Sequence, residues 1–438
     1  MRISFKYIIS LTCCLLIIGV FSGFAQQQIT LSKAIETALK NNLDIQISKN
    51  TVTVNNINNY IGVAGGLPTV SATASTTEQV TGLNQELSNG TSTNRTAVVG
   101  NNTQIGLTAT MLLFNGGRVI ATKERLAELQ HLSQEQLNST IQNAIADVTI
   151  KYFAVVQQQN FVTTLNQSIE VSKQKLALIE ARKNVGLSND AELFQARLDL
   201  NAQTQALLSQ RIIIQQSKTD LLRSLVLSQD TEISISDTIL VDKNIQWESI
   251  QTSIKNNPSI LSAEVQININ KIIEREANAR RYPTVNVNTG YSYSRNQSDA
   301  GFTLLNQNYG PFVGVNVAVP IYAGSVNLRQ IQVAKVNTQT ARLQKEVLFQ
   351  NFQNSASKSW EAYKSTLDLI EAEKQNYELA GKLLNLITQK FQLGQATIID
   401  IKQAQQSFEN SGYRLNNLSY TAKIAEITLK QIANQLSI

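Results

Sequence analysis

Hydrophobic residues recur every seven positions along four long stretches of the chain. The first stretch, residues 119–185, contains no proline and no glycine, and the second begins after Gly186. In the first half the positions are Ile141, Val148, Val155, Val162, Ile169 and Leu176, then Leu193, Leu200, Leu207, Ile214 and Leu221. In the second half they are Phe349, Ala356, Tyr363, Ile370, Tyr377 and Leu384, then Ile401, Phe408, Leu415, Ala422 and Leu429. A sustained period of seven predicts long helices packed as antiparallel coiled coils.

Apolar residues also occur away from this seam, namely Phe153, Phe161, Leu165 and Ile179. Each long helix is therefore expected to pack on more than one neighbour. A further helix is predicted from Ser32 to Gly65-Gly66, because Ile35, Ala38 and Leu39 follow helical spacing and few helix breakers intervene.

Two other regions alternate between apolar and polar residues with a period of two. One side carries Val285, Val287, Thr289, Tyr291 and Tyr293, then Val313, Val315, Val317 and Val319, and in the first half Ile105, Leu107, Ala109, Met111 and Leu113. Val70, Ala72 and Ala74 continue the pattern more weakly. Strands of about ten residues with one polar face are typical of membrane barrels, although a soluble sandwich alternates too. The segments between them, 78–101 and 296–310, are rich in Asn, Ser, Thr and Gly and are expected to be flexible exposed loops.

The chain contains two copies of one unit. Lys40-Asn41-Asn42 returns 215 positions later as Lys255-Asn256-Asn257, and Pro68-Thr69-Val70 returns as Pro283-Thr284-Val285. After a deletion of seven residues, Phe114-Asn115-Gly116, Gly186 and Gln195-Ala196 return 208 positions later as Tyr322-Ala323-Gly324, Gly394 and Gln403-Ala404. We predict a first repeat at 26–226, a linker at 227–246 and a second repeat at 247–438.

The first 25 residues have the features of an export signal that is removed. Arg2 and Lys6 precede an apolar run that ends at Gly23-Phe24-Ala25. Cleavage after Ala25 removes both cysteines, Cys13 and Cys14, and lowers the formal net charge from +6 to +4. No later window is apolar enough to span a bilayer as a helix, which takes about 20 residues. If the mature protein crosses a membrane, it does so with strands.

Composition argues against several classes of function. The chain has one histidine, His131, no cysteine outside the leader and few charged residues, 16%. We therefore predict no catalytic residues, no metal site and no cofactor. A weak basic excess without clusters of Lys and Arg gives no support to nucleic-acid binding.

Four strands cannot close a barrel, and hydrocarbon tolerates no unpaired sheet edge. Two chains would supply eight strands, and the interior of an eight-stranded barrel is filled by side chains. Three chains would supply twelve strands and leave a water-filled bore. We therefore predict a homotrimer in outer-membrane lipid, with the helices continuing the wall as a tunnel in the periplasm. The predicted fold is mainly α with a β-barrel part, internally duplicated, with four transmembrane strands per chain.

Taken together, the duplication, Leu67-Pro68, Phe114-Asn115-Gly116-Gly117 and the two glycine-containing turns resemble the TolC-type outer-membrane efflux and secretion channels. The resemblance covers the whole mature chain. It implies a trimeric exit duct that an inner-membrane pump reaches through a periplasmic adaptor. It also implies that the adaptor docks on the turns, at Gly186, Leu187 and Ser188 and at Gly394, Gln395 and Ala396.

The family's periplasmic aperture often carries two aspartates soon after the second turn. Asp400 matches the first and Gln403 replaces the second. Asp400 either belongs to a cation-attracting ring on the threefold axis or is a first-turn residue favoured by the helix dipole. Glu192 matches an acidic position of a salt-bridge latch in this family. The basic partner position holds Ala396 and a tyrosine position holds Phe391, so the latch is expected to be absent or rebuilt.

Three other functions remain open from the sequence alone. The outer-membrane component of an ATP-driven protein secretion system fits the same sequence features as an efflux duct. A soluble periplasmic coiled coil would lack the membrane barrel. An enzyme would have to use His131, which has no carboxylate-rich surroundings in the sequence.

Overall fold

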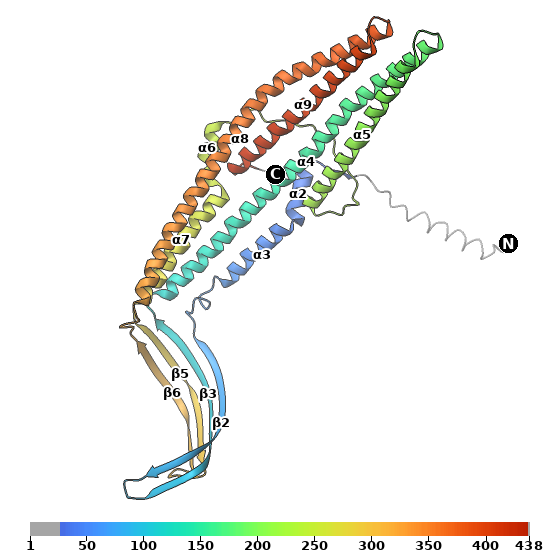
Figure 1. The fold of residues 1–438 in the computed structure, drawn as a ribbon. Helices are drawn as coiled ribbons and strands as arrows, with labels where there is room; N and C mark the ends of the chain where they lie inside the picture. The colour runs from blue at the N-terminus through green and yellow to red at the C-terminus, as the bar shows by residue number, and fades with distance from the viewer. Residues whose placement is uncertain (1–26, 437–438) are drawn as a thin grey trace, which may run out of the picture. The chain divides into compact units, whose positions relative to one another are not determined.

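The structure, a computed structural model, describes residues 27–436, so the predicted signal peptide at 1–25 lies outside the described residues. The helices are α2 (Leu31–Asn41), α3 (Leu43–Asn58), α4 (Arg118–Asn184), α5 (Asp190–Leu225), α6 (Trp247–Ser253), α7 (Pro258–Ala279), α8 (Val326–Gln392) and α9 (Ile398–Ile432), with a 3₁₀ turn, η1, at Ile254–Asn256 (Figure 1). The strands are β1 (Gln27–Gln28), β2 (Thr69–Glu86), β3 (Ser92–Phe114), β4 (Ile233–Ser234), β5 (Thr284–Ser298) and β6 (Leu305–Ala318).

The long helices predicted from the seven-residue period are confirmed. Helices α4 and α8 each contain 67 residues, which corresponds to roughly 100 Å at 1.5 Å per residue. Most residues of the predicted seams are buried or half-buried. Phe153, Leu165 and Ile179, which lie off the seam, are buried as well. Each of these helices therefore packs on more than one side.

The prediction of one continuous helix from Ser32 to Gly65-Gly66 is wrong. The segment breaks at Asn42, whose ψ of 124° is not helical, and the second piece, α3, ends at Asn58. The Asn42 side chain accepts a hydrogen bond from Ile45 N at 3.1 Å and so starts α3. The second repeat breaks at the equivalent residue, Asn257, which precedes Pro258. The repeated Lys-Asn-Asn motif thus marks a helix break in both copies.

The chain forms two compact units, and each contains segments of both repeats. Unit 1 comprises residues 27–46, 139–257 and 350–436, and unit 2 comprises residues 47–138 and 258–349. Both long helices have residues in both units.

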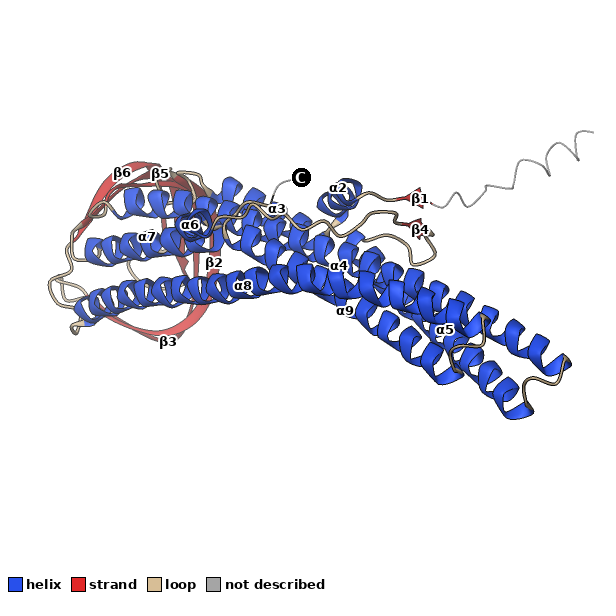
Figure 2. Ribbon diagram, turned by 90° about the horizontal axis from the view of Figure 1, so that it is seen from above, coloured by secondary structure: helices blue, strands red, loops and turns tan. Residues whose placement is uncertain are grey.

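Unit 1 is a bundle formed by α5, α9 and the C-terminal parts of α4 and α8. Its main core lies where α4, α5 and α2 meet the parallel pair β1 and β4 (Figure 2). The core residues include Ile35, Tyr152, Val155, Leu221 and Ile233. The Tyr152 hydroxyl lies 3.0 Å from Ile29 O and 2.5 Å from Asp237 Oδ2, both hydrogen-bond acceptors. Burial, together with the bond and the charge of Asp237, raises the pKa of Tyr152.

Unit 2 contains a four-stranded antiparallel sheet with the order β2-β3-β5-β6. The register aligns the apolar positions in rows across the strands. One row is Ala72, Leu107, Tyr291 and Pro311, and the next is Val70, Ala109, Thr289 and Val313. Their large apolar side chains are exposed, with Leu107 at 52% and Val313 at 78%. The predicted alternation of apolar and polar faces is confirmed, and this apolar face is left largely uncovered by the chain's described residues.

The predicted loops at 78–101 and 296–310 are largely strand, which corrects the prediction. Strand β2 runs to Glu86 and β3 begins at Ser92, and the pair remains hydrogen-bonded to its end except at a bulge between Thr81 and Leu83. The second hairpin has strand residues up to Ser298 and again from Leu305. Strand preference depends strongly on context, so a composition rich in Asn, Ser and Thr was misleading here. In residues 27–436, no helix combines the length and the apolar character needed to span a membrane.

Candidate functional site at the hairpin tips

The two long hairpins of unit 1 end in equivalent turns. Gly186 follows α4 with φ +78° and Gly394 follows α8 with φ +77°, a conformation that favours glycine. Gly186 N donates to Lys183 O at 2.9 Å and Leu187 N donates to Arg182 O at 2.8 Å. Around Gly394 the bonds are the same, from Gly394 N to Phe391 O at 3.1 Å and from Gln395 N to Lys390 O at 2.8 Å. Both turns are Schellman motifs, which reverse the chain tightly after a helix.

The helices that leave the turns begin with equivalent caps. Asn189 Oδ1 accepts from Glu192 N at 2.9 Å and caps α5. Thr397 caps α9, because its Oγ1 accepts from Asp400 N at 3.2 Å while Asp400 Oδ2 accepts from Thr397 N at 2.8 Å. This reciprocal pair is a capping box. Two hydrogen bonds lower the pKa of Asp400. The larger effect comes from the Thr397 backbone N–H and the smaller from the Thr397 hydroxyl.

The predicted aperture residues lie on two different helices. Asp400 and Gln403 are exposed on α9, one turn apart, whereas Ile401 and Ala404 beside them are buried. Glu192 is half-exposed at the start of α5, and its carboxylate accepts from Ser188 Oγ at 2.5 Å. The contacts of Asp400 are those of a capping residue in the first turn of α9. Its backbone N and Oδ2 take part in the capping box, whereas Oδ1 does not.

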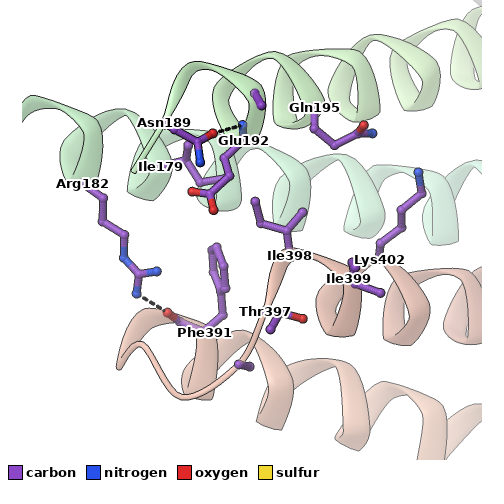
Figure 3. Close-up of a pocket in the computed structure, with 12 residues that line it drawn as sticks. Ile179, Arg182, Asn189, Glu192, Gln195, Phe391, Thr397, Ile398, Ile399 and Lys402 are labelled. Carbon is purple, nitrogen blue, oxygen red and sulfur yellow. Dashed lines mark hydrogen bonds between the residues drawn. The ribbon is translucent and has the colours of Figure 1, made fainter. Parts of the chain in front are cut away.

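A groove of about 660 Å³ lies between the tips (Figure 3). Its walls come from all four helices and both turns, namely Ile179, Arg182, Asn189, Ala191, Glu192, Gln195, Phe391, Ala396, Thr397, Ile398, Ile399 and Lys402. Of these wall residues, Ile179 and Phe391 belong to the apolar cluster at this end of the bundle, and Ile398 packs against it. The groove therefore has an apolar interior, with Arg182, Glu192 and Lys402 as charged groups on its walls.

Arg182 links the two hairpins across this groove. Its Nη2 donates to Phe391 O at 2.6 Å (Figure 3), and its guanidinium carbon lies 5.0 Å from the centre of the Phe391 ring. Phe391 is only 3% exposed. One side chain of α4 thus holds both the backbone and the ring at the end of α8.

Asp199 of α5 links the hairpins one level deeper. It accepts from Lys175 of α4 at 2.7 Å and from Lys402 of α9 at 3.2 Å. The Lys175 side chain is fully buried. Burial is the largest influence on Asp199 and opposes its ionisation, but the bonds from Lys175, Gln195 and Lys402 and the charge of Lys175 together lower the pKa of Asp199.

Sequence reasoning placed the turns but missed Arg182, Lys175 and Asp199. A signal for two of them was present. Phe161, Ser168, Lys175 and Arg182 follow one another at intervals of seven on α4, and both Ser168 and Lys175 are buried. Polar and charged residues that recur every seven positions indicate a second packed seam whose side chains have partners inside the bundle. The spacing does not identify those partners, because they lie on other helices.

Comparisons with known proteins match most of the chain. The family profile described as outer membrane efflux protein matches residues 34–225 and 249–435. The outer membrane protein TolC of Vibrio cholerae is 23% identical over 70% of this chain and 70% of its own length. The outer membrane efflux protein BepC of Brucella suis is 21% identical over 88% of this chain and 81% of its own length.

Solved structures show the same fold. The CmeC outer membrane channel of Campylobacter jejuni superposes with a TM-score of 0.77 at 16% identity, covering 92% of this chain and 85% of its own. CusC superposes with a TM-score of 0.74 at 18% identity, covering 94% and 95%. The predicted mainly α, duplicated fold with a barrel part is confirmed, as are the outer-membrane location and the role as an exit duct. The chain belongs to the outer membrane efflux protein family.

Proposed function

We propose that three copies of this outer-membrane efflux duct pool their sheets into one twelve-stranded barrel. The observation that carries the proposal is the sheet itself. Among the described residues, β2 and β6 pair on one side only, and the apolar face is exposed. Hydrocarbon would leave both edges unsatisfied, whereas joining β6 of one copy to β2 of the next satisfies them all.

Cross-linking tests this assembly. The mature chain has no cysteine if it is cleaved after Ala25, so introduced cysteines have no background. Each variant carries one cysteine in place of Val315 on β6 and a second cysteine at one position of β2. The second position is varied from Val70 to Thr77. At some positions we expect oxidised ladders that stop at three chains. Monomers at every position, or ladders that continue past three chains, would refute the shared barrel.

The chain would then consist of two repeats, 26–226 and 247–438, joined by the linker 227–246. Each repeat would supply one hairpin tip. The repeated turns and caps at the tips support this division. Around the trimer six similar tips would face the periplasm.

The tips form the docking surface for a periplasmic adaptor that delivers substrate from an inner-membrane pump. Leu187 and Leu393 support this part of the proposal, because they are 77% and 73% exposed beside the two glycines. Leu187 follows the glycine of its turn and Leu393 precedes the glycine of the other, so each tip exposes an apolar side chain that suits a partner surface. Ser188, Gln395 and Ala396 complete the two turns.

Substitution at the tips tests the docking. Leu187→Asp with Leu393→Asp is expected to abolish copurification with the adaptor while leaving the trimer and its ion current intact. Leu208→Asp, on an exposed stretch of α5, is the matched control. Equal adaptor recovery from both proteins would contradict docking at the tips.

The aperture is proposed to lie at the same end, with Asp400 and Gln403 on the pore side and Glu192 on the neighbouring helix. Support comes from the exposure of Asp400 and Gln403 on α9. Three Asp400 carboxylates near a threefold axis would attract cations.

A further inference from the structure

Three segments at the end of the sheet that joins the helices are basic and contain no carboxylate. No Asp or Glu occurs in residues 96–123, 277–298 or 300–345. These segments contain Arg118 at the start of α4, Arg280 and Arg281 before β5, and Arg329 in the first turn of α8. The opposite end of the sheet differs, because Glu86 and Asp299 lie at its turns.

Packing within unit 2 brings these arginines close together. A Cβ atom on Gly116 would lie 2.7 Å from both Ala279 O and Tyr282 Cβ, so the turn before Arg118 rests directly on the segment that holds Arg280 and Arg281. Arg280 and Arg329, together with Glu276, line one groove of about 430 Å³ between α7 and α8. Val326 and Val333 supply apolar walls of the same groove.

Within residues 27–436, no ion pair joins Arg118, Arg280, Arg281 or Arg329 to a carboxylate. Arg280 donates to the neutral amide oxygen of Gln330. The carboxylates of Glu276 and Glu124 are already taken, by Arg125 at 2.8 Å and by Arg275 respectively. The charge on the four arginines is therefore available to an external anion.

Exposed tyrosines accompany these arginines. Tyr282 is 56% exposed and Tyr322, between β6 and α8, is 83% exposed, next to Ile321 at 94%. Tyrosine and arginine beside an apolar strand face form the pattern found at the level of lipid headgroups. We call Arg118, Arg280, Arg281, Tyr282, Tyr322 and Arg329 the junction belt.

We propose that the junction belt binds the phosphates of anionic phospholipids in the periplasmic leaflet of the outer membrane. The inference rests on the proposed barrel, because the belt then lies at the headgroup level where the sheet leaves the membrane. Arginine forks match phosphate oxygens in pairs, and the tyrosine rings lie at the boundary of the acyl chains. The groove at Arg280 and Arg329 accepts one headgroup, with Val326 and Val333 against its glycerol and upper chain.

The proposal predicts selective retention of phosphatidylglycerol. Native mass spectrometry of the detergent-purified protein, titrated with phosphatidylglycerol, measures the apparent affinity. One arginine near an anionic surface contributes about fivefold in binding, so Arg281→Gln with Arg329→Gln is expected to weaken it roughly 25-fold. Arg281→Lys with Arg329→Lys should retain most of the affinity, because the charge remains.

A second pair of arginines, outside the junction belt, serves as the matched control. Arg211→Gln with Arg223→Gln removes two exposed arginines of α5 and should leave lipid binding unchanged. Equal affinities for the glutamine variant of the belt and for this control would overturn the proposal. So would displacement of the lipid by glycerol phosphate at equal concentration, because that would indicate a site for a soluble anion.

The same samples show which inference has failed. If the unmodified protein is not trimeric and passes no current, the shared barrel is wrong whatever the lipid result. If trimer and current are normal in every variant but the belt substitutions leave phosphatidylglycerol binding unchanged, only the junction belt is wrong.

Discussion

The guanidinium of Arg182 donates to the carbonyl oxygen of Phe391 at 2.6 Å and also lies over the Phe391 ring. The two residues are 209 positions apart and belong to different hairpins of unit 1. At the tips, where each hairpin ends, this contact ties the repeats of one chain together. Its strength therefore bears on how far the tips separate.

Removing this link is expected to loosen the tips. A hydrogen bond from a charged donor contributes about 1.5–3 kcal/mol, so Arg182→Ala should raise the resting current of the trimer in planar bilayers. Arg182→Lys should fall in between, because it keeps the charge but loses the planar fork. Arg197→Ala breaks only an exposed pair with Glu180 and should behave as the unmodified protein. A resting current identical in Arg182→Ala and Arg197→Ala would show that the link does not restrain the aperture.

Asp400 provides a test with two separable readouts. Asp400→Asn removes the charge but keeps an oxygen for the cap, so cation selectivity in planar bilayers should fall while heat stability changes little. Unchanged selectivity in Asp400→Asn would show that Asp400 caps the helix but does not contribute to cation selectivity.

The pH dependence of selectivity has a defined sign. Because its pKa is lowered by Thr397, Asp400 loses its charge at a lower pH than an ordinary aspartate, and cation selectivity should be lost at that lower pH. Thr397→Val removes the hydroxyl bond and should move this loss to higher pH. Identical selectivity curves for Thr397→Val and the unmodified protein would contradict the assignment.

The buried pair of Lys175 and Asp199 should be costly to break. Asp199→Asn leaves the fully buried Lys175 without a charged partner, which costs about 3–5 kcal/mol and should lower the thermal midpoint of the trimer. Lys402→Ala removes only the half-exposed partner, which is worth up to about 1 kcal/mol.

The pH dependence of this pair follows from the lowered pKa of Asp199. Its contribution to stability is present above the unfolded carboxylate pKa and is lost as the pH falls through the folded one. The difference in thermal midpoint between the unmodified protein and Asp199→Asn should therefore shrink in acid. A difference that stays constant down to the lowest pH at which the trimer survives would rule out this linkage.

Gly290 is predicted to be required in the sheet. A Cβ atom there would lie 2.1 Å from Leu107 O and 3.1 Å from the Phe312 ring, so backbone would have to move. Gly290→Ala should reduce the yield of heat-resistant trimer on denaturing gels. Gly106→Ala is the matched control, since its Cβ would meet only ordinary contacts, at 3.6 Å and 3.8 Å. Equal yields from the two variants would show that the sheet tolerates the shift.

The sequence predicted regular periodic features well and local exceptions poorly. Seven-residue spacing located α4 and α8, because a buried seam repeats along the whole helix, and the positions of Gly186 and Gly394 predicted both tips. Strand ends were missed at Glu86 and Ser92, because a two-stranded ribbon with two wet faces has no apolar pattern.

The helix break at Asn42 was missed as well. A repeated motif marked its position, but Asn occurs in helices, turns and caps alike, so the motif did not indicate the backbone conformation.

Long-range contacts could not be predicted for a different reason. The bond from Arg182 to Phe391 joins side chain to backbone across two repeats. No local spacing records such a pair, and only the packing of the four helices creates it.

The current carried by the purified protein in a planar lipid bilayer tests the shared barrel most directly, when the number of chains per conducting particle is measured on the same sample. We predict stepwise, cation-preferring currents from particles of three chains. A monomeric protein that remains in water and gives no current would contradict the account.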